Sequence, residues 1–203
     1  MYERIIPRIG AASGTLFVVL LFGLSSTGID SPIVIVGELI GLLLFIPFTG
    51  YLCSLLREAE GPGDWLATTA LGAGLVYIAI KLGSIAPGNA ADRFEDGTAT
   101  HQALDVMNST AYIATMLPLS VFMAAVATVI VKTRVLPRWL GWLAAVTAPL
   151  LLVNGMFLDA EFGPAFLLFL LWTLLASVIL TIRSGDVGSR SKAAQASTSD
   201  SSP

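Results

Sequence analysis

The sequence predicts an all-α polytopic membrane protein, a bundle of six transmembrane helices with both termini in the cytoplasm (N-in/C-in). Three observations lead to this fold class. Hydrophobic residues make up 55% of the 203 residues and charged residues only 12%, with a mean hydropathy of +0.82, whereas soluble domains average about 25% charged residues. The apolar residues gather into six segments, each long enough to cross a hydrocarbon core, which takes about 20 residues. Lys and Arg fall almost entirely in alternate connections between these segments.

The six spans form one predicted domain, residues 1–183, with the lipid bilayer as its main partner. They are expected at about 9–28, 33–56, 65–84, 100–132, 138–157 and 164–183. No clean A-x-A cleavage pattern follows the first apolar run, so we expect a retained span there and not a cleaved secretory signal. Residues 184–203 are rich in Ser and Ala, and we expect a disordered cytoplasmic tail because this composition buries little apolar surface.

The first two spans carry residues that suit packed membrane helices. Gly10 and Gly14 form a GxxxG pair, which lets a neighbouring helix approach closely. The alternative is that small residues are simply common in membrane helices. The second span begins at Ser31-Pro32, a cap followed by a first-turn proline. Pro47, in the middle of this span, is expected to kink it.

The remaining four spans are also bounded or bent by local signals. Asp64 can cap the third span. The fourth span, at roughly 33 residues, is longer than a bilayer requires, so we expect it to begin outside the hydrocarbon and to bend at Pro118. Pro149 is expected to kink the fifth span, and the sixth begins at Gly163-Pro164.

The orientation follows from the distribution of the 11 Lys and Arg residues. With a cytoplasmic N-terminus, two of them, Lys81 and Arg93, lie outside and the other nine lie inside. The nine are Arg4, Arg8, Arg57, Lys132, Arg134, Arg138, Arg183, Arg190 and Lys192. An even number of spans returns the C-terminus to the cytoplasm, so we predict a multi-pass protein of the plasma (cytoplasmic, inner) membrane.

Seven polar residues in or beside the spans are the candidate ligand-binding residues. They are Glu38, Lys81, His101, Asp105, Asn108, Tyr112 and Asn154. Those between 101 and 112 fall within about 60° of one another on a helix, and the topology puts residues from four spans in the outer leaflet. Because ionisable groups within spans usually face the bundle interior or a wet cavity, we predict an outward-facing polar pocket. The alternative is structural: Lys81 and His101 reach the headgroups while Asp105 and Asn108 join helices by hydrogen bonds.

No cofactor or metal ion is predicted. His101 and Asp105 could share a cation, but zinc sites need three or four protein ligands, and Glu38 supplies a third only if the second and fourth spans pack together. The lone cysteine, Cys53, rules out an intrachain disulfide. No phosphate loop, dinucleotide fingerprint or HExxH helix is present. Nucleic acid is not an expected partner, because no basic patch is interleaved with aromatic residues.

The segment Arg134–Leu143, RVLPRWLGWL, resembles a motif of small bacterial membrane proteins, the domain-of-unknown-function family 4386. The overall plan is similar as well, with six or seven spans and a polar loop after the second, here REAEGPG at 57–63. The resemblance implies a bacterial multi-pass membrane protein, and it brings no activity and no catalytic residue. Physically, Arg138 suits lipid phosphates, and Trp139 and Trp142 suit an interfacial aromatic belt.

Three functional hypotheses follow. The leading one is a membrane protein whose outward polar pocket binds a small molecule or cation, as a transporter-like component or a sensor; the lack of an inverted repeat between 1–99 and 100–183 argues against a complete transporter. The second is a non-catalytic accessory or scaffold subunit of a homo-oligomer or a larger complex, docking through small-residue faces. The third, an intramembrane enzyme with a His101–Asp105 acid–base pair, lacks a nucleophile or metal, so a non-enzymatic role is favoured.

Overall fold

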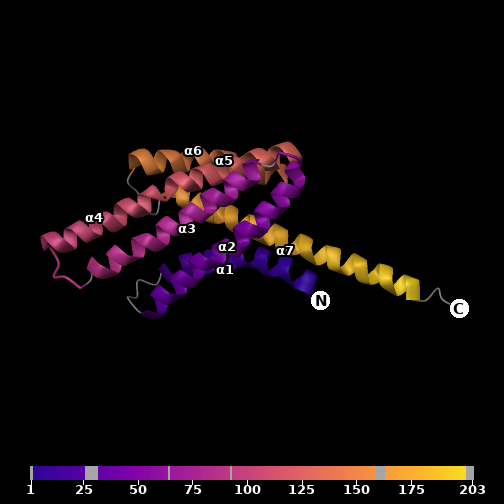
Figure 1. Ribbon diagram of the computed structural model, residues 1–203, viewed down its shortest axis with the longest axis horizontal. Helices are drawn as coiled ribbons and strands as arrows, with labels where there is room; N and C mark the ends of the chain where they lie inside the picture. The colour runs from indigo at the N-terminus through magenta and orange to yellow at the C-terminus, as the bar shows by residue number, and fades with distance from the viewer. Residues whose placement is uncertain (1, 26–31, 64, 92, 159–162, 200–203) are drawn as a thin grey trace.

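The computed structural model describes the backbone of residues 2–25, 32–63, 65–91, 93–158 and 163–199. These residues form helices joined by short connections, and no strand occurs among them (Figure 1). In chain order the helices are α1 (Tyr2–Ser25), α2 (Pro32–Glu60), α3 (Trp65–Ala91), α4 (Ala99–Ala114), α5 (Met116–Thr133), α6 (Arg138–Val153), the π-helical turn η1 (Asn154–Leu158) and α7 (Pro164–Ser199). The predicted all-α class is therefore confirmed.

Five helical segments of the described chain are long and apolar enough to cross a membrane. They are Val36–Glu60, Trp65–Ala91, Ala99–Thr133, Arg138–Phe157 and Pro164–Arg183. The segment at the position of the first predicted span, Arg8–Gly23, is apolar but shorter. The chain therefore has the make-up of a multi-pass membrane protein, while the sixth crossing and the N-in/C-in orientation stay predictions.

The core of the bundle is a cluster of aromatic rings centred on Phe45 of α2. The ring of Phe17 in α1 lies 4.9 Å from it, centroid to centroid, and that of Tyr77 in α3 lies 5.6 Å away. Phe122 in α5 and Phe169 in α7 are each at 5.9 Å, in the edge-to-face arrangement that aromatic pairs favour. All five side chains are completely buried. One ring from each of five helices thus fixes how the bundle is assembled.

Glycines allow the helices of this chain to pack closely against one another. A Cβ atom added at Gly10, Gly14 or Gly74 would lie 2.5–2.8 Å from side-chain atoms of α2, and one at Gly141 would lie 2.9 Å from side chains of α5. Under the scaffold hypothesis, the small-residue faces Gly10/Gly14, Ala70/Gly74 and Gly141/Ala145 were expected to dock a partner. In the structure, the four glycines of these faces already pack against helices of the same chain.

α4 and α5 together form one bent helix of 35 residues, about 50 Å long, against about 30 Å of hydrocarbon in a bilayer. The break lies at Thr115, whose hydroxyl donates to the carbonyl of Tyr112 at 2.5 Å. The sequence predicted the bend at Pro118, and the break precedes it because proline cannot donate to the carbonyl of Ala114 four residues back. The start of α4 and the end of α3 extend together beyond the neighbouring helices, at the left of Figure 1.

α7 continues past its apolar segment to Ser199, and its last part extends away from the bundle (Figure 1). The backbone of 184–199 continues α7, and the disordered tail expected from the composition stays a prediction.

Candidate functional site

Three of the seven predicted site residues lie together where α3 packs against α4. The ammonium nitrogen of Lys81 stands 3.2 Å from the centroid of the Tyr112 ring, a cation–π contact. Asn108 lies one turn nearer the start of α4 and faces Gly88, where an added Cβ would be 3.2 Å from the Asn108 side chain. The predicted polar stripe on this helix is thus partly in contact with α3.

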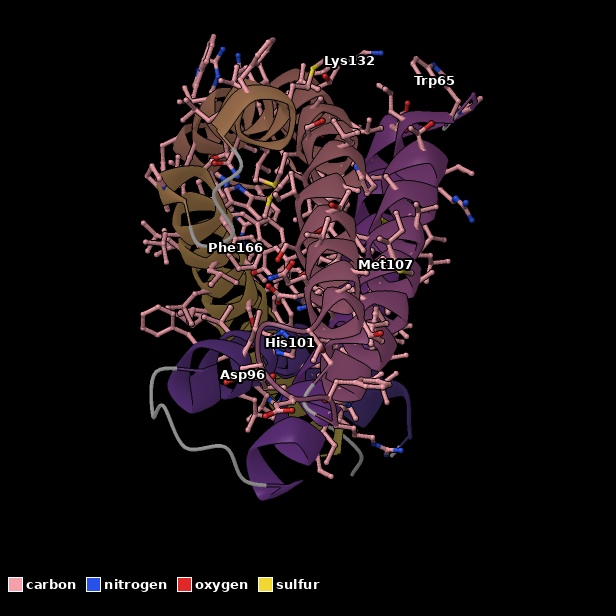
Figure 2. All side chains as sticks on the ribbon, turned by 90° about the vertical axis from the view of Figure 1, so that its left-hand side faces the viewer. Trp65, Asp96, His101, Met107, Lys132 and Phe166 are labelled. Carbon is pink, nitrogen blue, oxygen red and sulfur yellow. The ribbon has the colours of Figure 1, made fainter. Side chains whose placement is uncertain are left out.

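The other two residues of the stripe are placed differently. The Nε2 atom of His101 lies 3.4 Å from a carboxylate oxygen of Asp96, in the connection before α4, and Figure 2 shows the two side by side. Asp105 is exposed on the outer surface of α4. The acidic neighbour of His101 at ion-pair distance is therefore Asp96, whereas the enzyme hypothesis paired this histidine with Asp105.

The two remaining predicted residues come from α2 and η1. Glu38 is half-buried on α2, and Asn154 is completely buried at the first position of η1. The π-helical turn packs against the junction of α4 and α5, because a Cβ added at Gly155 would lie 3.0 Å from the Cβ of Met116. Among the side chains that the structure describes, no group of three His, Cys, Asp or Glu residues could hold a metal ion.

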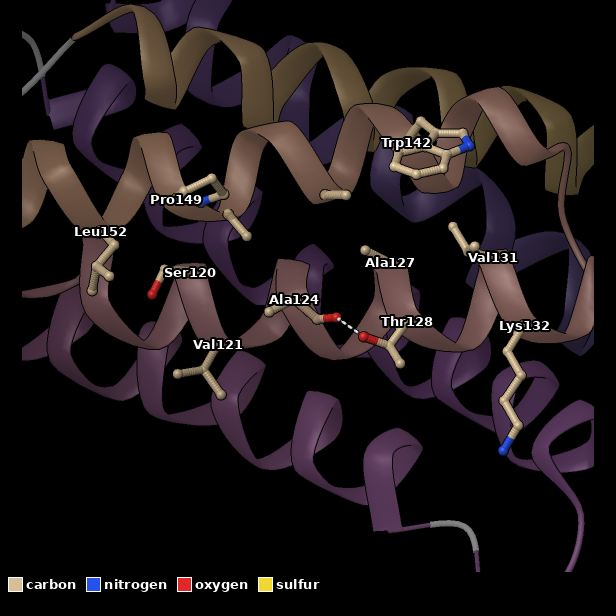
Figure 3. A pocket seen from close by; sticks show the side chains of 12 residues that line it. Ser120, Val121, Ala124, Ala127, Thr128, Val131, Lys132, Trp142, Pro149 and Leu152 are labelled. Atoms are coloured by element: carbon tan, nitrogen blue, oxygen red, sulfur yellow. Dashed lines mark hydrogen bonds between the residues drawn. The ribbon is translucent and has the colours of Figure 1, made fainter.

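A cavity of about 810 Å³ lies elsewhere, in a groove between α5 and α6 (Figure 3). This volume is in the range of small-molecule sites, about 300–1,000 Å³. None of the seven predicted site residues lines it. The lining residues are Ser120, Val121, Ala124, Ala127, Thr128, Val131 and Lys132 of α5, and Trp142, Ala145, Ala148, Pro149 and Leu152 of α6.

The groove is lined largely by small side chains of two helices that approach closely at Gly141. α6 approaches α5 at Gly141, where an added Cβ would lie 2.9 Å from side-chain atoms of Ile130 and of Val131. Farther along, alanines stand on both walls and leave room between the helices. The groove opens onto the outer surface of the bundle, because Val121 and Trp142 on its rims are 47% and 60% exposed.

The wall of the groove is apolar over most of its length. The hydroxyls of Ser120 and Thr128 donate to backbone carbonyls of their own helix, to Leu117 at 2.7 Å and to Ala124 at 2.8 Å. These two polar groups are therefore already satisfied. Lys132 lies at one end of the groove, and its exposed side chain extends from α5 on the side away from Trp142 (Figure 3). The site is thus amphipathic, with an apolar trench and a single cationic end.

Sequence reasoning missed this groove, because it searched for polar residues within spans. The signal that could have found it is the pairing of small residues on two consecutive spans, Ala124 and Ala127 with Ala145 and Ala148. From the sequence, Lys132 was interpreted as one of the cations that set the membrane orientation, and Trp142 as part of an interfacial aromatic belt. Neither was considered as a groove residue.

Comparison of this chain with models of protein families, with curated proteins and with solved structures gives no match. The resemblance of the Arg134–Leu143 segment to a bacterial membrane family therefore stays a prediction, and the functional argument rests on geometry.

Proposed function

We propose that this protein is an integral membrane protein that binds an amphipathic molecule drawn from the bilayer, held along the α5–α6 groove. The observation that carries the proposal is the combination of an apolar groove of about 810 Å³ with a cation, Lys132, at one end. This keeps the leading class inferred from the sequence, a ligand-binding membrane protein that acts as a transporter-like component or sensor. It moves the binding site from the outer polar residues to the lateral face of the bundle.

The physical basis of binding is shape and not the hydrophobic effect. Lipid tails are as apolar as the groove wall, so transfer from the bilayer brings no hydrophobic gain. A molecule that fits between two rigid helices gains dispersion contacts on both of its sides, and each contact adds about 0.1–0.2 kcal/mol. The walls are parts of regular helices, so little ordering is needed when the ligand binds.

The proposal is tested with a photoreactive hydrophobic probe, a diazirine-bearing fatty acid, added to the full-length protein in lipid nanodiscs. We expect mass spectrometry to find cross-links concentrated on residues of the groove. The variant Ala124→Trp fills the groove from an exposed position and should abolish them. The matched control is Val146→Trp, because Val146 is 54% exposed on α6 and does not line the groove. Cross-links spread evenly over the outer surface, or unchanged in Ala124→Trp, would refute the proposal.

A second candidate function is the outer polar site predicted from the sequence, supported by the Lys81–Tyr112 contact. Lys81, Asn108 and Tyr112 present a cation, an amide and an aromatic ring at one helix interface, and a small molecule or ion could bind there. The test is thermal unfolding in detergent against a panel of small anions and cations. We expect a stabilising ion whose effect disappears in Lys81→Gln. A site that serves only to join the helices gives no such ion, and Lys81→Gln then lowers the melting temperature under every condition.

A further inference from the structure

We infer that the ligand of the α5–α6 groove is a phospholipid with an acidic headgroup, whose acyl chain lies between the helices and whose phosphate contacts Lys132. The inference rests on the proposed function and names its ligand class. It is carried by the length of the groove, the charges at its end and the aromatic residues beside them.

The length of the groove matches one leaflet of a bilayer. From Lys132 to Ser120 the lining of α5 covers 12 residue steps, about 18 Å of helix at 1.5 Å per residue. Half of a hydrocarbon core is about 15 Å. A single acyl chain therefore fits the groove end to end when its headgroup lies at the Lys132 end.

Three cations gather at that end. Lys132, Arg134 and Arg138 all have exposed side chains, and among the described residues no acidic side chain pairs with them. Arg183 of α7 is engaged differently, because it donates to the carbonyl of Val135 at 2.5 Å and fixes the turn between α5 and α6. The groove end is thus complementary to an anionic headgroup, and each such cation contributes about 1 kcal/mol near an anionic membrane surface.

Arg134 stands in a backbone conformation that favours glycine. It caps α5 with φ 58° and ψ 25°, in the left-handed region. Such a position commonly holds glycine, because a side chain there costs about 1–2 kcal/mol. A phosphate contact made by its guanidinium would offset part of that cost.

Two tryptophans place this end at headgroup depth. Trp139 and Trp142 are 51% and 60% exposed, and tryptophan concentrates at the membrane–water interface. The groove leads from this depth toward the middle of the bilayer. A soluble anion would use the cations and leave the apolar trench empty, so a lipid fits the whole site better.

A second copy of the chain fits the groove less well. In a membrane, a two-fold dimer axis runs along the bilayer normal, so the same surface of both copies meets at the same depth. The Lys132 ends of the two grooves would then face each other, and like charges would be brought together. The cation cluster therefore favours an anionic occupant over a symmetric dimer.

The test measures which lipid stays bound to the full-length protein. We reconstitute it with equal amounts of phosphatidylglycerol and phosphatidylcholine carrying the same acyl chains, extract it in mild detergent, and count the retained lipids by native mass spectrometry. We expect phosphatidylglycerol to be retained in preference. Lys132→Gln should lower this preference about fivefold, because one cation contributes ~1 kcal/mol to binding an anionic headgroup. Ala124→Trp should remove the bound lipid. Arg57→Gln, an exposed cation at the end of α2, is the control and should change nothing.

The outcomes separate the inference from the proposed function. Equal retention of both lipids that is still lost in Ala124→Trp would overturn the acidic headgroup and leave the groove as a binding site. If Ala124→Trp retains as much lipid as the unaltered protein, both the acidic headgroup and the groove as a lipid site are overturned. Both are also overturned if the protein is a dimer and Ala124→Trp dissociates it, because a second copy of the chain then fills the groove. The last arm uses inorganic phosphate without added lipid. A Lys132-dependent rise in melting temperature there would assign the site to a soluble anion and overturn the lipid.

Discussion

At the scale of single residues, many hydroxyls of this apolar chain donate to a carbonyl of their own helix, as those of Ser120 and Thr128 do, while other polar side chains contact a second helix. Lys81 of α3 lies over the ring of Tyr112 in α4. The hydroxyl of Ser177 in α7 accepts the backbone N–H of Thr15 in α1 at 2.8 Å and donates to the carbonyl of Ala11. In a bilayer the hydrophobic effect does not drive helices together, so such contacts and close packing hold them. Joining helices is thus one role of the polar residues, whether or not a ligand also binds.

The first prediction concerns the pair Lys81 and Tyr112. A double-mutant cycle with Lys81→Met and Tyr112→Leu should give a coupling of about 1 kcal/mol, because the contact lies between two packed helices and is partly shielded from water. The measurement is the free energy of unfolding in detergent for the four proteins. Strictly additive effects of the two substitutions would show that the ammonium and the ring do not interact.

At the scale of helices, the close pairing of α1 with α2 depends on the absence of a side chain at Gly14 of α1. A Cβ atom at Gly14 would lie 2.5 Å from the ring of Phe48, which is itself completely buried. At Gly23, in the same helix, an added Cβ meets no atom within 4 Å. Substituting each of the two glycines therefore shows whether a glycine in α1 is needed for close packing or is simply one of the small residues common in membrane helices.

The second prediction uses this contrast. Gly14→Ala should destabilise the protein by about 1–3 kcal/mol, because the buried ring of Phe48 has no room to move away. Gly23→Ala should be neutral or stabilising by up to about 1 kcal/mol, since alanine has the higher helix propensity. Thermal unfolding of both variants checks this. An equal effect of the two substitutions would mean that the α1–α2 interface tolerates a wider spacing.

Helices were predictable from the sequence, and contacts between them were not. Every backbone amide inside a bilayer has to find its partner within the helix or barrel, so an apolar run of this length, such as Trp65–Ala91, predicts a helix directly. The same hydropathy does not tell which face of a helix meets a neighbour. Asn108 and Asp105 are close in sequence and similar in polarity, yet one faces α3 and the other is exposed. The groove beside Ala124 was missed for this reason too.

At the scale of the whole molecule, the ring cluster around Phe45 connects all parts of the bundle, because α1, α2, α3, α5 and α7 each contribute a ring. Deleting the central ring leaves a cavity that five helices share. A change at this one position should therefore affect unfolding of the bundle as a unit. It should not loosen one helix alone.

The third prediction is that Phe45→Ala lowers the stability by on the order of 2 kcal/mol. Soluble cores lose ~3–5 kcal/mol for this substitution, but in lipid the water-transfer part is absent and the cavity part remains. Chemical unfolding should stay a single transition at a lower denaturant concentration. Phe22→Ala is the control, because Phe22 is 51% exposed on α1. An equally large loss of stability in Phe22→Ala would show that the buried ring cluster contributes no more to stability than an exposed ring does.

The fourth prediction concerns how many times the chain crosses the membrane, which the distribution of Lys and Arg predicts as six. The shorter apolar segment Arg8–Gly23 is the decisive one. If α1 crosses, residue 3 and the α2–α3 turn lie on the same side, because two crossings separate them. If α1 lies outside the bilayer, only α2 separates them and they lie on opposite sides.

Single cysteines at Glu3, Pro62 and Glu95, each in a Cys53→Ser background, distinguish these arrangements. We expect a membrane-impermeant maleimide to label Glu95→Cys on intact cells, and to reach Glu3→Cys and Pro62→Cys only after permeabilisation, because nine of the 11 cations then lie inside. The unaltered Cys53 is 4% exposed and serves as the unlabelled reference. Labelling of Glu3→Cys on intact cells, with Pro62→Cys protected, would establish five crossings and an N-terminus outside. Lys132 would keep its place on the cytoplasmic side in both arrangements, so the groove would still meet the inner leaflet.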